Sequence, residues 1–236
     1  MKSIIKIILA AVIIAGSGLT VSANESAYQT EERQVSGFTG VEAGGSFDVY
    51  IKQGSTESVK IDAPADVMEY IITEVRNGTL KIHTKTKSGR VFSNKKVIVY
   101  VSAKQLNNVG VSGSGNIFFQ DGIRSNTLNL AVSGSGSITG KVEAQTLEGR
   151  ISGSGNMKLT GSATTSNVSV SGSGNYNGVG LKTETTSARV SGSGNVKVNA
   201  GVKVDASVSG SGSVRYTGGA KEVSKSKSGS GSISSF

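Results

Sequence analysis

The chain has 236 residues, a formal net charge of +9 and no cysteine. The lack of cysteine excludes a disulfide framework, a thiolate-based metal site and lipid attachment to a cysteine after a signal peptide. The charge is basic but moderate, so it favours anionic surfaces without requiring one.

The first 23 residues have the pattern of a secretory signal peptide. Lys2 and Lys6 supply the positive start, residues 7–19 form an apolar run, and Val21-Ser22-Ala23 places small residues at the cleavage position. We expect the mature chain to begin near Asn24, to carry a charge of +7 without the two lysines, and to be periplasmic, at the cell surface or secreted. An uncleaved anchor is the alternative, but the run is shorter than the ~20 residues that cross a bilayer. No later segment predicts a transmembrane span.

Residues 24–34 are polar and are predicted to form a flexible N-terminal segment. Residues 35–110 are predicted to be β-rich, with strands at 47–52, 59–63 and 96–101. Residues 67–75 fit either a helical turn or a strand, and Asn77-Gly78 predicts a tight hairpin turn. This region fits either a separate β cap or wider coils of the repeat that follows.

An internal repeat occupies residues 111–236. Ser-Gly-Ser-Gly occurs seven times at spacings of 18 to 21 residues, beginning at Ser112, Ser133, Ser152, Ser171, Ser191, Ser209 and Ser228. Between these blocks apolar residues alternate with period two, which indicates strands. A second glycine follows most blocks, at Gly122, Gly140, Gly161, Gly178, Gly201 and Gly218.

A unit of about 20 residues cannot bury its own apolar face, so the repeats must stack. The sequence therefore predicts an all-β fold, a parallel β-helix (solenoid) of about seven coils. The rule for parallel crossovers makes it right-handed. Each coil should be a strand, a Ser-Gly-Ser-Gly corner, a second strand and a glycine corner. Both corners are expected to use positive φ, which favours glycine.

Several motifs together resemble one known family. They are Val35-Ser36-Gly37-Phe38, Phe47-Asp48-Val49 with Gln53-Gly54, Gly78-Thr79-Leu80-Lys81-Ile82 and the repeated Ser-Gly-Ser-Gly-Asn. From about residue 35 to the end, the chain resembles the putative auto-transporter adhesin, head GIN domain family. The resemblance implies an exported, right-handed β-helical protein of the kind common in Bacteroidetes-type bacteria. It implies an adhesin's role but no particular catalytic or binding residues.

The sequence offers no catalytic constellation. His83 is the single histidine and has no cysteine or second histidine with which to bind a metal, so we expect it at the surface. No serine has an activating base at an evident spacing. We predict a protein that is not an enzyme and has no cofactor. The alternative is a polysaccharide-active enzyme in which Asp48, Asp62 or Asp66 converge in one groove.

The residue after each Ser-Gly-Ser-Gly block is always asparagine or serine. These residues are Asn116, Ser137, Asn156, Asn175, Asn195, Ser213 and Ser232. Stacked coils would align them in a column whose side chains bond along the axis and stabilise the corner. Contact with a ligand is the less favoured interpretation.

Cations gather in a segment that has no acidic residue. The candidate patch for an anionic ligand consists of Arg76, Lys81, Lys85, Lys87, Arg90, Lys95 and Lys96. An anionic glycan or lipid would fit such a patch, and a solvated loop is the alternative. Nucleic acid is not expected as a partner of an exported chain with few aromatic residues.

The leading functional prediction is a non-catalytic envelope protein that binds a cell-surface glycan or protein. A structural, self-associating module is a further alternative, and the oligomeric state stays open. The repeat ends with Lys225 and Lys227 at positions that are apolar in earlier coils. Unpaired ammonium groups are too costly to bury. Residues 223–236 are therefore predicted to be a frayed or lid-like coil, with Ile233 and Phe236 over the core.

Overall fold

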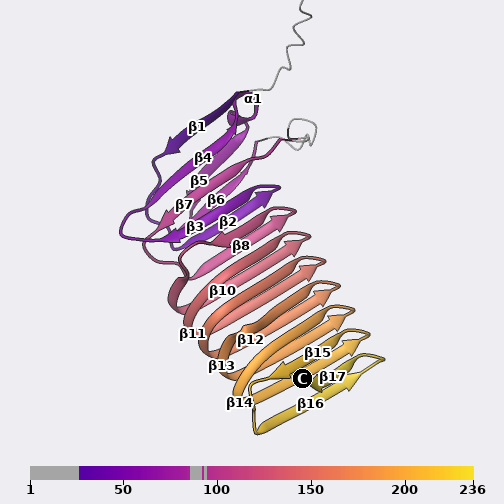
Figure 1. Cartoon of the computed structure of the whole chain (residues 1–236). Coiled ribbons are helices and arrows are strands. Elements are labelled where there is room, and N and C mark those ends of the chain that lie inside the picture. Colours follow the sequence, from indigo (N-terminus) through magenta and orange to yellow (C-terminus); the bar gives the residue numbers. More distant parts are fainter. Residues whose placement is uncertain (1–26, 86–91, 93–94) are drawn as a thin grey trace, which may run out of the picture.

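The computed structural model describes residues 27–85, 92 and 95–236. The predicted signal peptide therefore lies outside the described residues. The described chain forms one rod of stacked β coils, with β1 and α1 at one end and the C-terminus at the other (Figure 1). Its strands are linked into a single 17-stranded sheet that wraps around the rod. The one described helix, α1, is far too short to cross a membrane.

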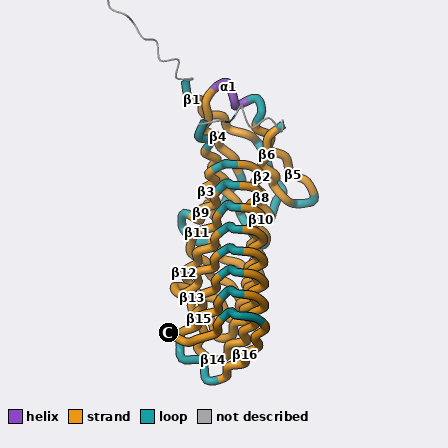
Figure 2. The backbone as a smooth tube through the Cα atoms, turned by 90° about the vertical axis from the view of Figure 1, so that its right-hand side faces the viewer, coloured by secondary structure: helices purple, strands orange, loops and turns teal. Residues whose placement is uncertain are grey.

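The Ser-Gly-Ser-Gly repeats form successive coils of a parallel solenoid, as predicted. Their strands are β10 (Ile123–Gly134), β11 (Ser137–Gly153), β12 (Asn156–Gly172), β13 (Asn175–Gly192) and β14 (Asn195–Gly210). Equivalent block residues pair from coil to coil, so Ser152 faces Ser171 and Ser171 faces Ser191. The block loops of successive coils consequently lie directly above one another (Figure 2).

The second corner differs from the prediction. Backbone pairing continues around it, so each coil is one long bent strand rather than two short ones. Positive φ occurs there at Gly122, Gly161 and Gly218, but not at Gly140, Gly178 or Gly201. At Gly178 the requirement is space, because a Cβ would lie 2.6 Å from Cε1 of Tyr176.

The two glycines of each block serve different purposes. Gly153 is the first glycine of its block and has φ of +111°, a conformation that costs little only for glycine. The second glycine does not adopt positive φ, so the expectation of positive φ at Gly174 is wrong. A Cβ at Gly174 would instead lie 2.6 Å from the carbonyl oxygen of Gly155 in the coil before it. The block therefore turns at its first glycine and stacks closely at its second.

The core consists of the inward residues of each coil, as the period-two alternation predicts. The inward residues of β14, for example, are Val204, Ala206 and Val208, and each is at most 1% exposed. Large and small residues complement each other across the core. Gly149 takes an inward position, and a Cβ there would lie 3.4 Å from Cε2 of the buried Tyr176. This fit is typical of close-packed interiors.

The N-terminal region adds coils to the same solenoid. β2 (Gly40–Gly45) and β3 (Asp48–Gln53) form one coil, and β8 (Asn108–Gly113) and β9 (Asn116–Phe119) form the next. β6 (Thr79–Thr84) and β7 (Ile98–Ala103) pair with the opposite edges of β2 and β3. The first coil in sequence thus lies between two coils that come later. β8 crosses residues 110 and 111, so the sheet has no break at that predicted boundary.

Antiparallel strands cover the N-terminal end of the rod. β1 (Tyr28–Arg33) pairs with β4 (Ser58–Pro64), β4 pairs with β7, and β5 (Ile71–Arg76) pairs with β6. α1 (Ala65–Met68) follows β4. As predicted, Asn77-Gly78 forms the hairpin turn between β5 and β6, with φ of 50° and 70°. The cap and the wider coils, which the sequence offered as alternatives, are both present.

The prediction of a flexible segment at residues 24–34 is wrong for its described part. Tyr28–Arg33 is strand β1, although its side chains are mostly exposed. Its backbone pairs with all of β4. Arg33 Nη1 also donates to the carbonyl oxygen of Ile71 at 2.6 Å. The segment is ordered because it completes a strand edge that would otherwise be open.

The last coil is regular rather than frayed, which corrects the prediction. β16 (Glu222–Ser228) pairs with β14, and β17 (Ser232–Ser235) pairs with β15 (Ser213–Thr217), in full parallel register. Lys225 and Lys227 align with Ala206 and Val208, but both are exposed because no described coil covers them. Phe236 does not lie over the core, since its ring stacks 4.7 Å from the guanidinium carbon of Arg215.

Candidate binding surfaces

The residues after the Ser-Gly-Ser-Gly blocks form a hydrogen-bonded column on the outside of the rod. Asn175 Nδ2 donates to Asn156 Oδ1 at 3.0 Å, and Asn195 Nδ2 donates to Asn175 Oδ1 at 3.0 Å. Ser213 Oγ donates to Asn195 Oδ1 at 2.7 Å. These bonds all run in one direction along the axis. Each asparagine amide has two donors, so one N–H per residue remains for solvent or a ligand.

The column continues into the N-terminal coils through a residue that the sequence analysis did not include. Ser137 Oγ donates to Asn116 Oδ1 at 2.7 Å, and Asn116 Nδ2 donates to Asp48 Oδ1 at 2.9 Å. Asp48 occupies the same position in β3 that Asn116 occupies in β9. Alignment of Phe47-Asp48-Val49 with Gly115-Asn116-Ile117 would have indicated this equivalence.

The candidate basic patch does not form one cationic surface. Its described cations face carboxylates from other parts of the chain: Arg76 faces Glu74 at 2.9 Å, Lys81 faces Glu42 at 3.5 Å, Lys96 faces Asp48 at 3.4 Å, and Lys95 faces Asp66. Lys85 is exposed, whereas Lys87 and Arg90 lie outside the described residues. Folding brings carboxylates to a segment that has none of its own, and this weakens its attraction for anions.

His83 lies beside this group of charges and has an acidic partner. Its Nε2 is 3.2 Å from Oε1 of Glu74. The hydrogen bond from His83, followed by Arg76, holds the pKa of Glu74 below its ordinary value. A shallow depression of about 540 Å³ extends from His83 across β2, β8 and β10. Its floor consists of small residues, including Gly44, Gly110 and Ala131.

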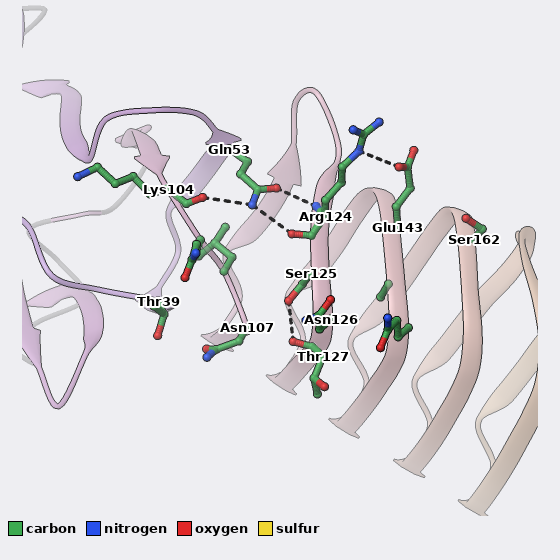
Figure 3. Close-up of a pocket in the computed structure, with 14 residues that line it drawn as sticks. Thr39, Gln53, Lys104, Asn107, Arg124, Ser125, Asn126, Thr127, Glu143 and Ser162 are labelled. Carbon is green, nitrogen blue, oxygen red and sulfur yellow. Dashed lines mark hydrogen bonds and ion pairs between the residues drawn. The ribbon is translucent and has the colours of Figure 1, made fainter.

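A polar groove of about 860 Å³ lies where β3, β10 and β11 turn (Figure 3). Gln53 joins three segments here: its Nε2 donates to the carbonyl oxygens of Lys104 and Arg124 at 3.3 and 3.1 Å, and its Oε1 accepts from Arg124 N at 2.8 Å. Glu143 pairs with Arg124 at 2.8 Å and with Lys141 at 2.9 Å. Lys141, and then Arg124, hold the pKa of Glu143 below its ordinary value. These mutual pairs indicate a structural junction.

Stacked aromatic rings mark the outer face of the first coils. The ring of Tyr50 lies 5.5 Å from that of Tyr100 and 5.0 Å from that of Phe118, with interplanar angles of 22° and 23°. Lys60 lies over the Tyr100 ring at 5.6 Å. Because the ring faces contact one another, only their edges remain for a ligand. This stack stabilises neighbouring coils.

The acids proposed for an enzyme are each held by other residues. Asp48 and Asp62 lie on one face, because both align with Ile98 from opposite sides of β7. Asp62 accepts from Thr30 at 2.7 Å and faces Lys60, whereas Asp66 is on α1 and pairs with Lys95. Within the described ranges, no group of three residues has the makeup of a metal site.

A second set of cations lies on the outer face beside the asparagine column. Lys158, Lys197 and Arg215 occupy equivalent positions on β12, β14 and β15, with Asn177 between them on β13. All four are exposed. A shallow groove of about 400 Å³ runs past Asn175, Asn177, Asn195, Lys197, Ser213 and Arg215. The sequence analysis missed this set, because its members are 18 to 39 residues apart.

Comparisons with known proteins agree with the fold. Residues 37–220 match the family described as "Putative auto-transporter adhesin, head GIN domain". A putative adhesin from Bacteroides fragilis has 25% identity over 89% of this chain and 97% of that chain, with a TM-score of 0.82. A putative lipid binding protein from Parabacteroides distasonis has 25% identity over 90% and 98%, with a TM-score of 0.73. No curated protein matches the chain.

A putative adhesin from Parabacteroides merdae shares the fold at 19% identity, over 90% of this chain and 97% of that chain, with a TM-score of 0.67. The same solenoid therefore recurs in chains whose sequences have diverged widely. Since the family match extends from the first N-terminal coil into the last turn of the repeat, this chain belongs to the putative auto-transporter adhesin, head GIN domain family.

Proposed function

We propose that this chain is an exported, non-catalytic adhesin that binds a cell-surface glycan along the outside of its solenoid. The observation that carries this proposal is the pair of parallel columns on the outer face. Asn156, Asn175 and Asn195 form one column, and Lys158 and Lys197 belong to the other. The surface repeats with every coil, about every 4.8 Å. An extended polymer can engage such a surface at many points, and weak contacts then combine.

A glycan fits this surface better than a membrane does. The exposed large apolar side chains of the described chain are Tyr28, in the N-terminal cap, and Val202, Val223 and Phe236, near the other end. The coils between them present polar columns instead. The similar protein from Parabacteroides distasonis carries the description "putative lipid binding protein", so a lipid headgroup is the second candidate ligand.

The non-catalytic part of the proposal rests on how the acids are used. Glu143 pairs with two cations, and Asp48 is bonded by both Asn116 and Lys96. General acid or base catalysis needs a carboxyl group that is free to exchange a proton with a substrate. Export is supported by the signal-like first 23 residues and by the adhesin family.

The test is a binding screen of the mature chain, residues 24–236, against a glycan array, soluble sugar polymers and phospholipid vesicles. A turnover assay on the same polymers runs beside it and measures released reducing ends. Binding to a glycan without turnover is the expected result. Turnover would show that the protein is an enzyme. Binding to vesicles alone would favour the lipid ligand, and self-association without any ligand would favour a structural module.

A further inference from the structure

The outer face of β12 to β15 carries cations without matching anions. The described ion pairs include Lys81, Lys95 and Lys96 of the candidate basic patch, but they do not include Lys158 or Lys197. Arg215 contacts the Phe236 ring and likewise has no carboxylate partner among the described residues. The unneutralised positive charge therefore lies on the repeat rather than in the basic segment of the sequence.

These cations lie in one line along the rod. Lys158 aligns with Asn177, Asn177 with Lys197, and Lys197 with Arg215. Neighbouring coils are about 4.8 Å apart, so the line from Lys158 to Arg215 spans roughly 14 Å over three steps. One small anion cannot contact both ends of such a line. A chain with several anionic groups can.

The strand segments around the line contain no acidic residue. They are residues 156–160, 175–177, 195–199 and 213–217. The neighbouring column adds neutral donors, because Asn175 and Asn195 each use one amide N–H in the column and keep the second. The groove of about 400 Å³ joins these amides to Lys197 and Arg215. Cations flanked by amide donors suit carboxylate and sulfate oxygens.

We propose that this groove, together with Lys158, binds the carboxylate or sulfate groups of an acidic polysaccharide that lies along the solenoid axis. This inference rests on the proposed glycan-binding function and names the ligand class. The asparagine column positions the sugar hydroxyls and the cation line selects for charge. A membrane is disfavoured, because the cations form a single line with no apolar side chains between them.

The test compares two variants that lose the same charge. In the groove variant, Lys158→Gln, Lys197→Gln and Arg215→Gln remove the unpaired cations. In the control variant, Arg76→Gln, Lys81→Gln and Lys96→Gln remove three cations that already face carboxylates. A double variant, Lys158→Gln with Lys197→Gln, keeps the contact between Arg215 and Phe236. Circular dichroism confirms that each variant is folded.

Binding is measured at fixed salt to polygalacturonate, dextran sulfate, neutral dextran and vesicles that contain phosphatidylserine. We expect the wild type to prefer the acidic polymers over dextran. The groove variant should lose about tenfold in affinity, as three exposed contacts of ordinary strength would give. The double variant should lose less, and the control variant should stay within about twofold. Comparison of the two acidic polymers distinguishes carboxylate from sulfate.

Three outcomes would overturn the inference. Equal losses in the groove and control variants would show that bulk charge alone matters. Unchanged affinity in the groove variant would place the ligand elsewhere. Wild-type binding to neutral glycans only would leave the proposed function standing and remove the acidic ligand. If the wild type bound no polysaccharide at all, whether or not it bound the vesicles, both proposals would fail.

Discussion

Four glycines separate the two costs of adding a Cβ, which are backbone strain and steric overlap. Gly110 should show neither cost, since its φ is not positive and its nearest neighbour would be Glu42 Cγ at 3.6 Å. Gly219 should show strain alone, with φ of +81° and no atom within 4 Å. Gly174 should show overlap alone, at 2.5 Å from Ile151 Cγ2. Gly153 should show both, with φ of +111° and Gly134 O at 2.6 Å.

The expected losses in unfolding free energy follow from these distances and angles. Gly219→Ala should cost about 1–2 kcal/mol, which is the cost of positive φ for a residue with a Cβ. Gly174→Ala should cost about 1–3 kcal/mol, because two coils must separate to admit the methyl group. Gly153→Ala combines both effects and should cost about 2–5 kcal/mol. Gly110→Ala should change stability by less than about 1 kcal/mol, and in the favourable direction.

Urea unfolding followed by far-ultraviolet circular dichroism measures these differences. A solenoid need not unfold in two states, so the midpoints are compared rather than extrapolated free energies. The expected order of midpoints, from highest to lowest, is Gly110→Ala, Gly219→Ala or Gly174→Ala, and Gly153→Ala. If Gly153→Ala and Gly174→Ala unfolded at the same urea concentration as Gly110→Ala, the account of the block corners would be wrong.

Further predictions concern the ends, the column, the charges and export. Deleting residues 223–236 replaces a coil edge that carries Lys225 and Lys227 with an apolar one, so light scattering should detect self-association; a monomeric product would contradict this. Asn175→Ala should cost about 1 kcal/mol in urea unfolding, whereas Ser232→Ala should be neutral. The lowered pKa of Glu74 stabilises the fold above pH 4.5 and loses that effect at lower pH. Glu74→Gln should therefore flatten the acid side of the stability profile. N-terminal sequencing of exported protein should start near Asn24, and an intact Met1 would argue against export.

The sequence by itself determined the repeat architecture. Seven Ser-Gly-Ser-Gly blocks at a nearly constant spacing, with alternating apolar residues between them, allow only a stacked β-solenoid. The inward residues and the hairpin at Asn77-Gly78 were equally predictable. These features depend on local rules, namely the two-residue period of strands and the φ that a turn requires. The position of the asparagine and serine residues in each coil followed from the same repeat.

Only the tertiary structure decided which charges are available and in what order the N-terminal coils stack. The coil of residues 40–53 lies between coils that are later in the sequence, and long-range strand pairing has no local signature. Lys81 and Lys96 are neutralised by Glu42 and Asp48, which are 39 and 48 residues away in the chain. Lys158, Lys197 and Arg215 come together for the same reason, because stacking converts a spacing of about one coil into a distance of about 4.8 Å.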